Sequence, residues 1–366
     1  MQTVVVGMSG GVDSSVAAYL LKEQGYQVIG VTMQIWQEEE PSCVANGCCG
    51  VSAVEDARRV AQCLEIPYYV MNFRNDFKEH VIDYFIREYH QGRTPNPCIA
   101  CNRYVKWEAL LERAKQIGAD YIATGHYAKI KHLENGRYAI ERSDHLKKDQ
   151  SYALYNLTQA QLSQTLFPLG AYEKEEVRRI AASRGLPIAH KPDSQEICFV
   201  PDNDYGTFLE KQMAPKQAVL GNFVNTKGEI LGVHKGIFHY TIGQRRGLGL
   251  SQKESVYVMN INPDTHEILV GTKEELQTTK VACEQLTMMS IEQFTFPATV
   301  MAKIRYNATA QKATLTKQDD DSYLCTFEEP VMGAASGQAI VFYENNCILG
   351  GAVINQKKLP CVNQYY

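Results

Sequence analysis

The sequence predicts an α/β protein in which a parallel sheet, covered by helices on both faces, is followed by smaller β-rich parts. Short apolar strands alternate with helical periods up to Pro201, and this alternation is typical of a parallel sheet with crossover helices. Beyond Pro201 the pattern changes to short alternating segments separated by Gly, Asn and Pro. A chain of 366 residues, 45% hydrophobic and 21% charged, suits two or three globular domains.

The first elements follow in strand and helix order. Residues 3–8 are rich in β-branched side chains and predict a buried strand, which the turn Ser9-Gly10-Gly11 joins to a helix over 12–24 that ends at Gly25. Further strands are predicted at 27–33, 67–71 and 120–124. Further helices are predicted at 51–64, 76–90, 105–117 and 173–184.

The chain beyond Pro201 is predicted to be rich in strands, with segments at 229–240, 255–262 and 267–271. From about residue 280 onward the same pattern favours a small barrel or a sandwich. Its predicted strands are 298–306, 311–317, 322–328 and 338–343.

Composition limits the classes of function. With 37 basic and 41 acidic residues the net charge is -4, which argues against a nonspecific polyanion binder. No apolar run approaches the roughly 18 residues of a membrane helix, and the start MQTVVVGMSGG lacks a signal-peptide pattern. We therefore expect a cytoplasmic protein with no membrane partner. Its 11 cysteines are then not expected to form a disulfide framework, because the cytosol keeps thiols reduced.

The segment from Ser9 to Ser15, SGGVDSS, stands between the first strand and the first helix. Glycines allow close backbone approach to a phosphate, and a helix N-terminus supplies N–H groups and a positive dipole end. A plain glycine-rich turn is the alternative. The string resembles the PP-loop of the N-type ATP pyrophosphatases, which implies cleavage of ATP between its α- and β-phosphates, with Asp13 helping to place Mg²⁺. Several chemistries share this loop.

Cysteines distinguish among these chemistries. The segment TPNPCIACN at 94–102 carries Cys98 and Cys101 in a predicted loop before a helix, and Cys198 lies near the end of the α/β part. A thiolate is a good nucleophile and sulfur carrier, so the pattern suggests sulfur transfer. A half zinc site or a redox pair is the alternative reading of the CxxC spacing.

The other eight cysteines carry no assignment. Three of them cluster in one loop, where unligated thiols are favoured over a metal site, and the rest are interpreted as buried or incidental thiols. The cluster comprises Cys43, Cys48 and Cys49, and the others are Cys63, Cys283, Cys325, Cys347 and Cys361.

Seven motifs, in family order over nearly the whole chain, make the sequence similar to the tRNA-specific 2-thiouridylases. They are SGGVDSS at 9–15, TPNPCIACNRYVKW at 94–107, ATGHYA at 123–128, KKDQSY at 147–152, KPDSQEICF at 191–199, GVHKGIFHYTIGQRRGLGL at 232–250 and KIRY at 303–306. The resemblance implies a PP-loop domain (1–203), a small central domain (204–278) and a C-terminal β-barrel (279–366).

The resemblance also implies a reaction. ATP adenylates the C2 oxygen of the wobble uridine (position 34) in the anticodon stem-loop of tRNA, and sulfur then displaces AMP. Cys198 carries a persulfide from an upstream sulfur-donor protein, and Cys101 resolves it, leaving a Cys101–Cys198 disulfide. A monomer is expected.

Matching positions imply further roles. The residues that match nucleotide-binding positions are Gly7, Met8, Ser9, Gly10, Gly11, Val12, Asp13, Ser14, Met33 and Gly125. The residues that match positions near the flipped-out base are Asn96, Pro97 and Cys98. The residues that match tRNA-contacting positions are His126, Lys148, Asp149, Gln150, Arg305, Tyr306 and Gln338.

Cys98 departs from the family pattern, in which many members carry Asp assigned as a general acid or base. A thiol of low pKa can act similarly. Three thiolates, Cys98, Cys101 and Cys198, also equal the number that holds a [4Fe-4S] cluster with one iron open to sulfide. The persulfide route is preferred over the cluster route.

Two stretches without acidic residues suit tRNA despite the negative net charge. Residues 235–253 and 300–317 each contain four cations, interleaved with Tyr240 and Tyr306. Solvated strand faces are the alternative. An amide-forming PP-loop ligase leaves Cys101, Cys198 and these stretches unexplained, and a noncatalytic RNA- or metal-binding protein leaves the phosphate loop unexplained.

Overall fold

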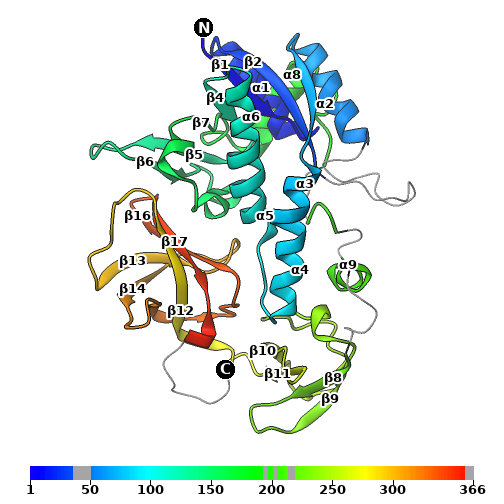
Figure 1. Ribbon diagram of the computed structural model, residues 1–366, viewed down its shortest axis with the longest axis vertical. Coiled ribbons are helices and arrows are strands. Elements are labelled where there is room, and N and C mark those ends of the chain that lie inside the picture. Colours follow the sequence, from blue (N-terminus) through cyan, green and yellow to red (C-terminus); the bar gives the residue numbers. More distant parts are fainter. Residues whose placement is uncertain (36–50, 193–196, 201–203, 213–218, 359–366) are drawn as a thin grey trace.

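A computed structural model describes residues 1–35, 51–192, 197–200, 204–212 and 219–358. The strands form three sheets of five, four and eight strands. Figure 1 shows the N-terminal α/β part at the top, the barrel below it and the small central sheet at the far end. The clustered cysteines Cys43, Cys48 and Cys49 lie outside the described residues, as does Cys361.

The N-terminal sheet is parallel, with strand order β3-β2-β1-β4-β7. Successive residues of β1 point to opposite faces, so that Val4 and Val6 pack in one core cluster and Val5 packs in another. Helices cover both faces, as predicted. The strands are β1 (Thr3–Gly7), β2 (Gln27–Gln34), β3 (Tyr68–Asn72), β4 (Tyr121–Ala123) and β7 (Thr165–Leu166).

One face is covered by α1 (Val12–Glu23), α2 (Val51–Cys63) and α8 (Lys174–Ser183). Along α2 and the residue after it, the buried positions Ala57, Val60 and Leu64 recur at helical spacing, whereas Cys63 is exposed. Of the two interpretations given for Cys63, a buried or an incidental thiol, the structure therefore excludes the buried one. The thiols of Cys283, Cys325 and Cys347 are buried, as predicted.

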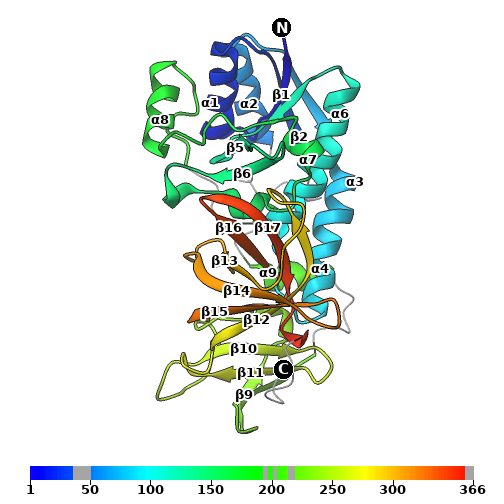
Figure 2. The same ribbon diagram turned by 90° about the vertical axis from the view of Figure 1, so that its left-hand side faces the viewer.

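Two long helical runs pack against the other face at their ends near the sheet and extend away from it, beside the barrel (Figure 2). The first comprises α3 (Arg74–Phe77), a π-helical stretch (Lys78–Ile82) and α4 (Asp83–His90). The second comprises α5 (Pro97–Ala100), a π-helical stretch (Cys101–Leu110) and α6 (Leu111–Gln116).

The second run begins earlier than the predicted helix at 105–117. Asn96 caps it, because its side chain accepts hydrogen bonds from the backbone N–H of Cys98 at 3.2 Å and of Ile99 at 3.3 Å. Pro97 occupies the first helical position, where its missing N–H costs nothing. Cys98 and Cys101 therefore lie in the first turns of the helix, and the prediction of a loop there was wrong.

The C-terminal strands close into an antiparallel barrel, because β12 pairs with both β15 and β17. This decides between the barrel and the sandwich. The six strands are β12 (Gln277–Met288), β13 (Ala298–Lys303), β14 (Gln311–Lys317), β15 (Tyr323–Met332), β16 (Ala339–Glu344) and β17 (Cys347–Ile354).

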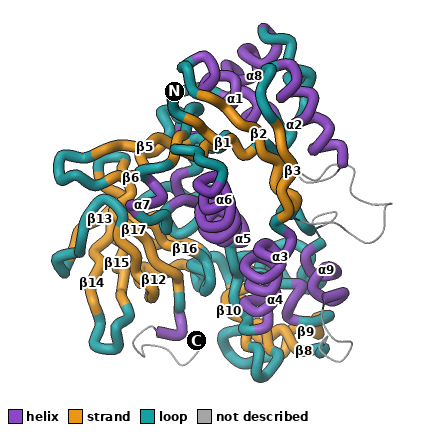
Figure 3. The backbone as a smooth tube through the Cα atoms, turned by 45° about the horizontal axis from the view of Figure 1, so that its top comes forward, coloured by secondary structure: helices purple, strands orange, loops and turns teal. Residues whose placement is uncertain are grey.

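An unpredicted hairpin connects the N-terminal part with the barrel. Its strands are β5 (Ala128–His132) and β6 (Tyr138–Arg142), and Glu141 of β6 pairs with Cys347 of β17. The hairpin extends the barrel sheet toward the N-terminal sheet (Figure 3). Short helical turns follow it at Leu146–Lys148, Ser151–Leu154 and α7 (Gln159–Leu162).

The central sheet has the order β10-β11-β8-β9. An unpredicted helix, α9 (Tyr205–Gln212), precedes it, and Phe208 of this helix packs against Phe85 of α4. The domain bounds at 203/204 and 278/279 stay a prediction. Within the described residues, no helix is both long and apolar enough to cross a membrane. The strands are β8 (Gly221–Val224), β9 (Ile230–His234), β10 (Tyr257–Asn262) and β11 (Glu267–Gly271), and short helical turns lie at Ile237–His239 and Gln356–Lys358.

Candidate functional site

The phosphate loop connects the carboxyl end of β1 to the N-terminus of α1. Its turn is closed by its own serines: the N–H of Ser9 donates to Ser14 Oγ at 3.1 Å, and Ser15 Oγ donates to Gly11 O at 2.8 Å. Gly11 is the N-cap of α1 and offers no side-chain cap. The loop therefore presents a helix N-terminus that an anion can bind.

Glycine is required at two places around this loop. Gly10 has φ +69°, and a Cβ there would lie 2.3 Å from the carbonyl oxygen of Ala53 on α2. A Cβ on Gly125 would lie 2.7 Å from the Asp13 carbonyl carbon and the Ser14 nitrogen. Gly125 therefore packs against the first turn of α1. Met33, also assigned to the nucleotide, is half-buried near the carboxyl end of β2.

Asp13 projects from the first turn of α1 and has two partners from distant segments. Lys174 Nζ donates to its two carboxylate oxygens at 2.7 and 2.8 Å, and the Tyr127 hydroxyl donates to Oδ1 at 2.7 Å. Its side chain is still 32% exposed. Mg²⁺ is commonly held by one or two carboxylates together with substrate phosphates, so Asp13 fits as a single ligand to a nucleotide-bound ion.

A second lysine contacts the loop. Lys191 Nζ donates to Gly10 O at 3.1 Å and pairs with Asp56 of α2 at 2.8 Å. Lys191 opens the segment that leads to Cys198, so one end of this segment is tied to the phosphate loop.

The other end of that segment is anchored in the aromatic core. Phe199 is 2% exposed, and its ring lies 5.5 Å from that of Phe77 and 5.4 Å from that of Phe85. Cys198 itself is exposed. An exposed thiol next to a fully packed residue is held in place and remains accessible, as a sulfur carrier must be.

The two thiols of the CxxC motif differ in exposure. Cys98 is exposed, and Cys101, one helical turn later, is half-buried against the core cluster that Ile197 also contacts. Among the described residues, no three Cys, His, Asp or Glu side chains are gathered so that they could hold a metal ion. The three thiols as placed here do not provide the ligand set of a [4Fe-4S] cluster.

His126 lies in an aromatic environment. Its ring lies 5.7 Å from that of Trp107 and 5.9 Å from that of Phe167, and Nδ1 hydrogen-bonds to Thr124 Oγ1 at 2.7 Å. Burial, with a smaller contribution from the charge of Lys106, holds the pKa of His126 well below its usual value of 6.5. The imidazole is therefore neutral at physiological pH.

The neutral state of His126 predicts a pH-dependent stability. Below about pH 6.5 the unfolded chain binds a proton at this residue and the folded chain does not. The free energy of unfolding therefore decreases by about 1.4 kcal/mol for each pH unit by which the pH is lowered. We expect His126→Gln to lose this slope when urea unfolding is measured between pH 7.5 and 5. Parallel pH profiles for the two proteins would contradict the assignment.

The segment 148–150 divides between surface and interior. Lys148 is exposed, whereas Asp149 is 6% exposed and accepts hydrogen bonds from the N–H groups of Ser143 and Ser151 at 3.1 and 3.2 Å and from Ser151 Oγ at 2.8 Å. Gln150 accepts from the Tyr127 N–H at 2.9 Å and donates its own N–H to Tyr127 O at 2.9 Å. Asp149 thus fixes the local turn, and Gln150 holds it against Tyr127, the residue that contacts Asp13.

A tyrosine pair lies where the helical turn Ser151–Leu154 meets the barrel. Tyr306 is 39% exposed, and its ring meets that of the buried Tyr152 edge-on at 6.4 Å. Lys303 Nζ lies 5.7 Å from the Tyr306 centroid and 5.8 Å from the Tyr152 centroid. Burial raises the pKa of Tyr306, and the charges of Asp149 and Cys98 add to the rise.

Gln338 joins the barrel to the segment before Cys98. Its side-chain amide donates to Thr94 O at 2.9 Å and to Pro95 O at 3.2 Å, and the N–H of Thr94 donates to Ser336 O at 2.7 Å. These bonds fix the approach to Asn96. Arg305 donates to Met332 O, so its guanidinium is partly engaged within the barrel.

The two basic stretches fare differently. In 300–317, Lys312 pairs with Glu328 at 2.6 Å and Lys317 pairs with Asp321 at 2.9 Å. Acidic residues that follow the stretch in the chain thus neutralise two of its four cations. In 235–253 all four cations are exposed: Lys235, Arg245, Arg246 and Lys253.

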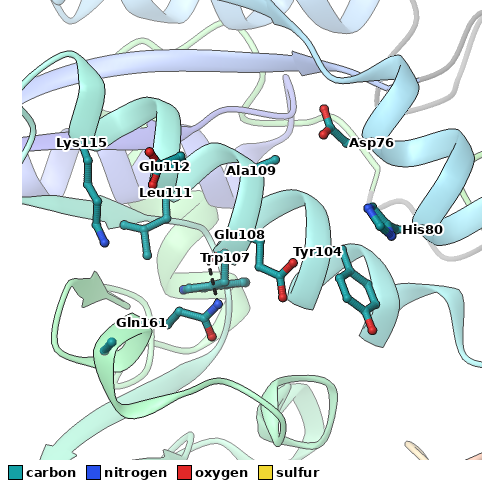
Figure 4. Close-up of a pocket in the computed structure, with 11 residues that line it drawn as sticks. Asp76, His80, Tyr104, Trp107, Glu108, Ala109, Leu111, Glu112, Lys115 and Gln161 are labelled. Atoms are coloured by element: carbon teal, nitrogen blue, oxygen red, sulfur yellow. Dashed lines mark hydrogen bonds between the residues drawn. The ribbon is translucent and has the colours of Figure 1, made fainter.

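Two cavities flank the helical runs. One of 460 Å³ is lined by Asp76, His80, Tyr104, Glu108 and Glu112 and contains no residue predicted for the site (Figure 4). The other, of 540 Å³, includes Asn96, Arg87 and Arg103 together with barrel residues. Of these two cavities, only the 540 Å³ one includes Asn96, the residue that caps the CxxC helix.

Sequence reasoning missed four residues with partners in the site. Tyr127, Tyr152 and Lys191 stand inside motifs that the resemblance used, and this position was the available signal. Lys174 stands in no motif, and a lysine in the first turn of a helix gives no sign of burial.

Three family models match the chain in order. They are a tRNA methyl transferase HUP domain over residues 2–202, a tRNA methyl transferase PRC-barrel domain over 206–272 and an aminomethyltransferase beta-barrel domain over 278–354.

Full-length relatives bear a more specific name. The chain is 59% identical to the tRNA-specific 2-thiouridylase MnmA of Lachnoclostridium phytofermentans over 97% of its own length and 99% of the relative's. It is 54% identical to the protein of that name from Clostridium perfringens, over 96% of this chain and 98% of the relative. At this identity, over almost the full length of both proteins, the chain belongs to the tRNA-specific 2-thiouridylase family.

Proposed function

We propose that this protein is a tRNA-uridine 2-sulfurtransferase that replaces the C2 oxygen of the wobble uridine with sulfur at the expense of ATP. The observation that carries the proposal is the presence, in one chain, of a phosphate loop at the start of α1 and of a CxxC helix whose first turn exposes Cys98. The proposal includes a cytoplasmic location, a monomeric state and an upstream persulfide donor.

The activation step uses the phosphate loop. Adenylation of the C2 oxygen turns a poor leaving group into AMP, and pyrophosphate departs. The N-terminus of α1 stabilises the charge that builds up on the phosphates, and Gly10 and Gly125 permit the close backbone approach. Mg²⁺, with Asp13 as a ligand, would supply further positive charge.

The sulfur step uses two cysteines. The terminal sulfur of a Cys198 persulfide attacks C2 and AMP leaves, which gives a C2–S–S–Cys198 adduct. The Cys101 thiolate then attacks the Cys198 sulfur and breaks the S–S bond to the RNA, leaving 2-thiouridine and a Cys101–Cys198 disulfide. An external dithiol reduces that disulfide and returns both thiols.

Cys98 replaces the acid–base Asp of many family members. It is exposed at the second helical position, and Tyr306 lies within range of its charge. We propose that it contacts the target base together with Asn96 and Pro97. Iron and labile-sulfide analysis of anaerobically purified protein decides against the [4Fe-4S] route if an iron-free sample is active with a persulfide donor.

Mass spectrometry of tRNA nucleosides tests the function. The protein is incubated with unmodified tRNA, ATP, Mg²⁺ and a persulfide donor. We expect 2-thiouridine together with equimolar AMP and pyrophosphate. Absence of 2-thiouridine with every sulfur source, while AMP forms on a different acceptor, would overturn the proposal.

Tyr306 is proposed to stack on RNA, because it is the exposed member of the tyrosine pair. Base stacking on an aromatic side chain is worth about 1–3 kcal/mol, so Tyr306→Ala should weaken tRNA binding about 5- to 150-fold. Lys312→Ala is the matched barrel control, because Glu328 already pairs with this lysine. Equal losses for both variants in a filter-binding titration would contradict a stacking role.

A further inference from the structure

Lys174 is a buried lysine next to the phosphate loop that no motif identifies. It is the first residue of α8 and 6% exposed, and it pairs with both oxygens of Asp13 in the first turn of α1. Helices α1 and α8 pack against each other, as Figures 1 and 2 show. The first turns of the two helices therefore meet at this ion pair.

A buried ion pair such as Lys174–Asp13 is expected to contribute little to the stability of the folded protein. Removing two charges from water costs about as much as their attraction returns, and apolar residues of similar size often stabilise a protein equally well. The pair is also asymmetric, because Lys174 is almost fully buried while the Asp13 side chain is 32% exposed. The exposed member of the pair is thus Asp13, which lies in the phosphate loop.

The loop itself lacks a cation. Residues 7–15, Gly-Met-Ser-Gly-Gly-Val-Asp-Ser-Ser, include one acid and no base, and the acid lies at the helix N-terminus where phosphates would bind. A departing pyrophosphate carries several negative charges. Lysine serves as a point charge in phosphate sites, and Lys174 is in direct contact with this turn.

We propose that Lys174 is the phosphate-binding lysine of this loop. Its ammonium exchanges an Asp13 oxygen for an oxygen of the β- or γ-phosphate of ATP and holds the pyrophosphate as it leaves. No proton moves, since the ammonium changes only its acceptor. The inference rests on the proposed function and deepens its activation step.

Tyr127 makes this exchange possible. Its hydroxyl donates to Asp13 Oδ1 independently of Lys174, so the carboxylate keeps a hydrogen bond when the lysine turns to the phosphates. Gln150 holds the Tyr127 backbone through two hydrogen bonds of 2.9 Å.

Calorimetric titration with pyrophosphate, ATP and AMP tests the assignment. In Lys174→Met we expect affinity for pyrophosphate and ATP to fall about 10- to 100-fold, the range for a lost charge-assisted hydrogen bond. AMP lacks the β- and γ-phosphates, so its affinity should change less than about threefold. Lys129→Met is the control, because Lys129 is also ion-paired, to Glu141 and Asp144, but lies outside the loop.

A second comparison tests whether Lys174→Met loses affinity only because the variant does not fold. Asp13→Asn/Lys174→Met removes both charges, and it is compared with Asp13→Asn alone after circular dichroism confirms that both fold. Weaker pyrophosphate binding in the double variant supports the proposal. Equal pyrophosphate binding in these two, or an equal loss for AMP and pyrophosphate in Lys174→Met, overturns it. A wild-type protein that makes no 2-thiouridine instead overturns the proposed function, whatever the titrations give.

Discussion

Replacement of Cys198 by Ala is expected to abolish 2-thiouridine formation while tRNA-dependent release of pyrophosphate continues. The persulfide has no other carrier in this scheme, so the loss of product should be at least about a thousandfold, as for other nucleophile deletions. Activation depends on the phosphate loop at residues 9–15, which does not include Cys198. Nucleoside mass spectrometry and a pyrophosphate assay on the same reaction separate the two steps.

Cys63→Ala is the matched control for this experiment. Cys63 is also exposed, but it ends α2 on the side of the helix that points away from the core and belongs to no site motif. This variant should make 2-thiouridine at the wild-type rate. If Cys198→Ala formed as much 2-thiouridine as the wild type, the assignment of the persulfide to Cys198 would be wrong.

Cys101→Ala extends the same test. Without the resolving thiol, the C2–S–S–Cys198 adduct cannot be released by the protein and should accumulate as a covalent complex of protein and tRNA. Denaturing gels with and without a reductant detect it. Free 2-thiouridine at the wild-type rate without reductant would assign the resolving step to another thiol.

The fold was predictable where the pattern is local. The strand from Thr3 to Gly7 and the helix after it are marked by β-branched residues, glycines and helical spacing, so their bounds were confirmed within a residue or two. Pairing over long distances left no such mark. The hairpin β5–β6 joins the barrel through Glu141 and Cys347, about 200 residues apart in the chain, and nothing near residue 141 predicts this partner.

The site was predictable in composition but less so in orientation. The resemblance assigned Asp149 and Gln150 of KKDQSY to the tRNA, whereas the carboxylate of Asp149 is buried among hydrogen bonds from Ser143 and Ser151. A polar residue gives the same sequence signal whether it binds a ligand or satisfies backbone N–H groups. Likewise Asn96-Pro97 suits a turn as well as a helix start, and only the cap geometry decides.

Gly10→Ala is expected to remove ATP binding, with Gly118→Ala as its matched control. Both glycines have positive φ, +69° and +78°, so both alanine variants lose about 1–2 kcal/mol in the left-handed conformation. Their surroundings differ. A Cβ at Gly118 has nothing within 4 Å, whereas a Cβ at Gly10 would lie 2.3 Å from the carbonyl oxygen of Ala53.

The contact at Gly10 cannot relax cheaply. Ala53 is 1% exposed, and it belongs to α2, whose Asp56 pairs with Lys191, the lysine that also binds Gly10 O. Alanine therefore pushes the loop away from α2 and breaks the turn that presents the N-terminus of α1. We expect ATP affinity to fall by at least about 100-fold, equivalent to two lost hydrogen bonds to a charged group. Gly118→Ala should bind ATP as the wild type does, so an equal affinity for Gly10→Ala in calorimetry would show that this turn does not form the nucleotide site.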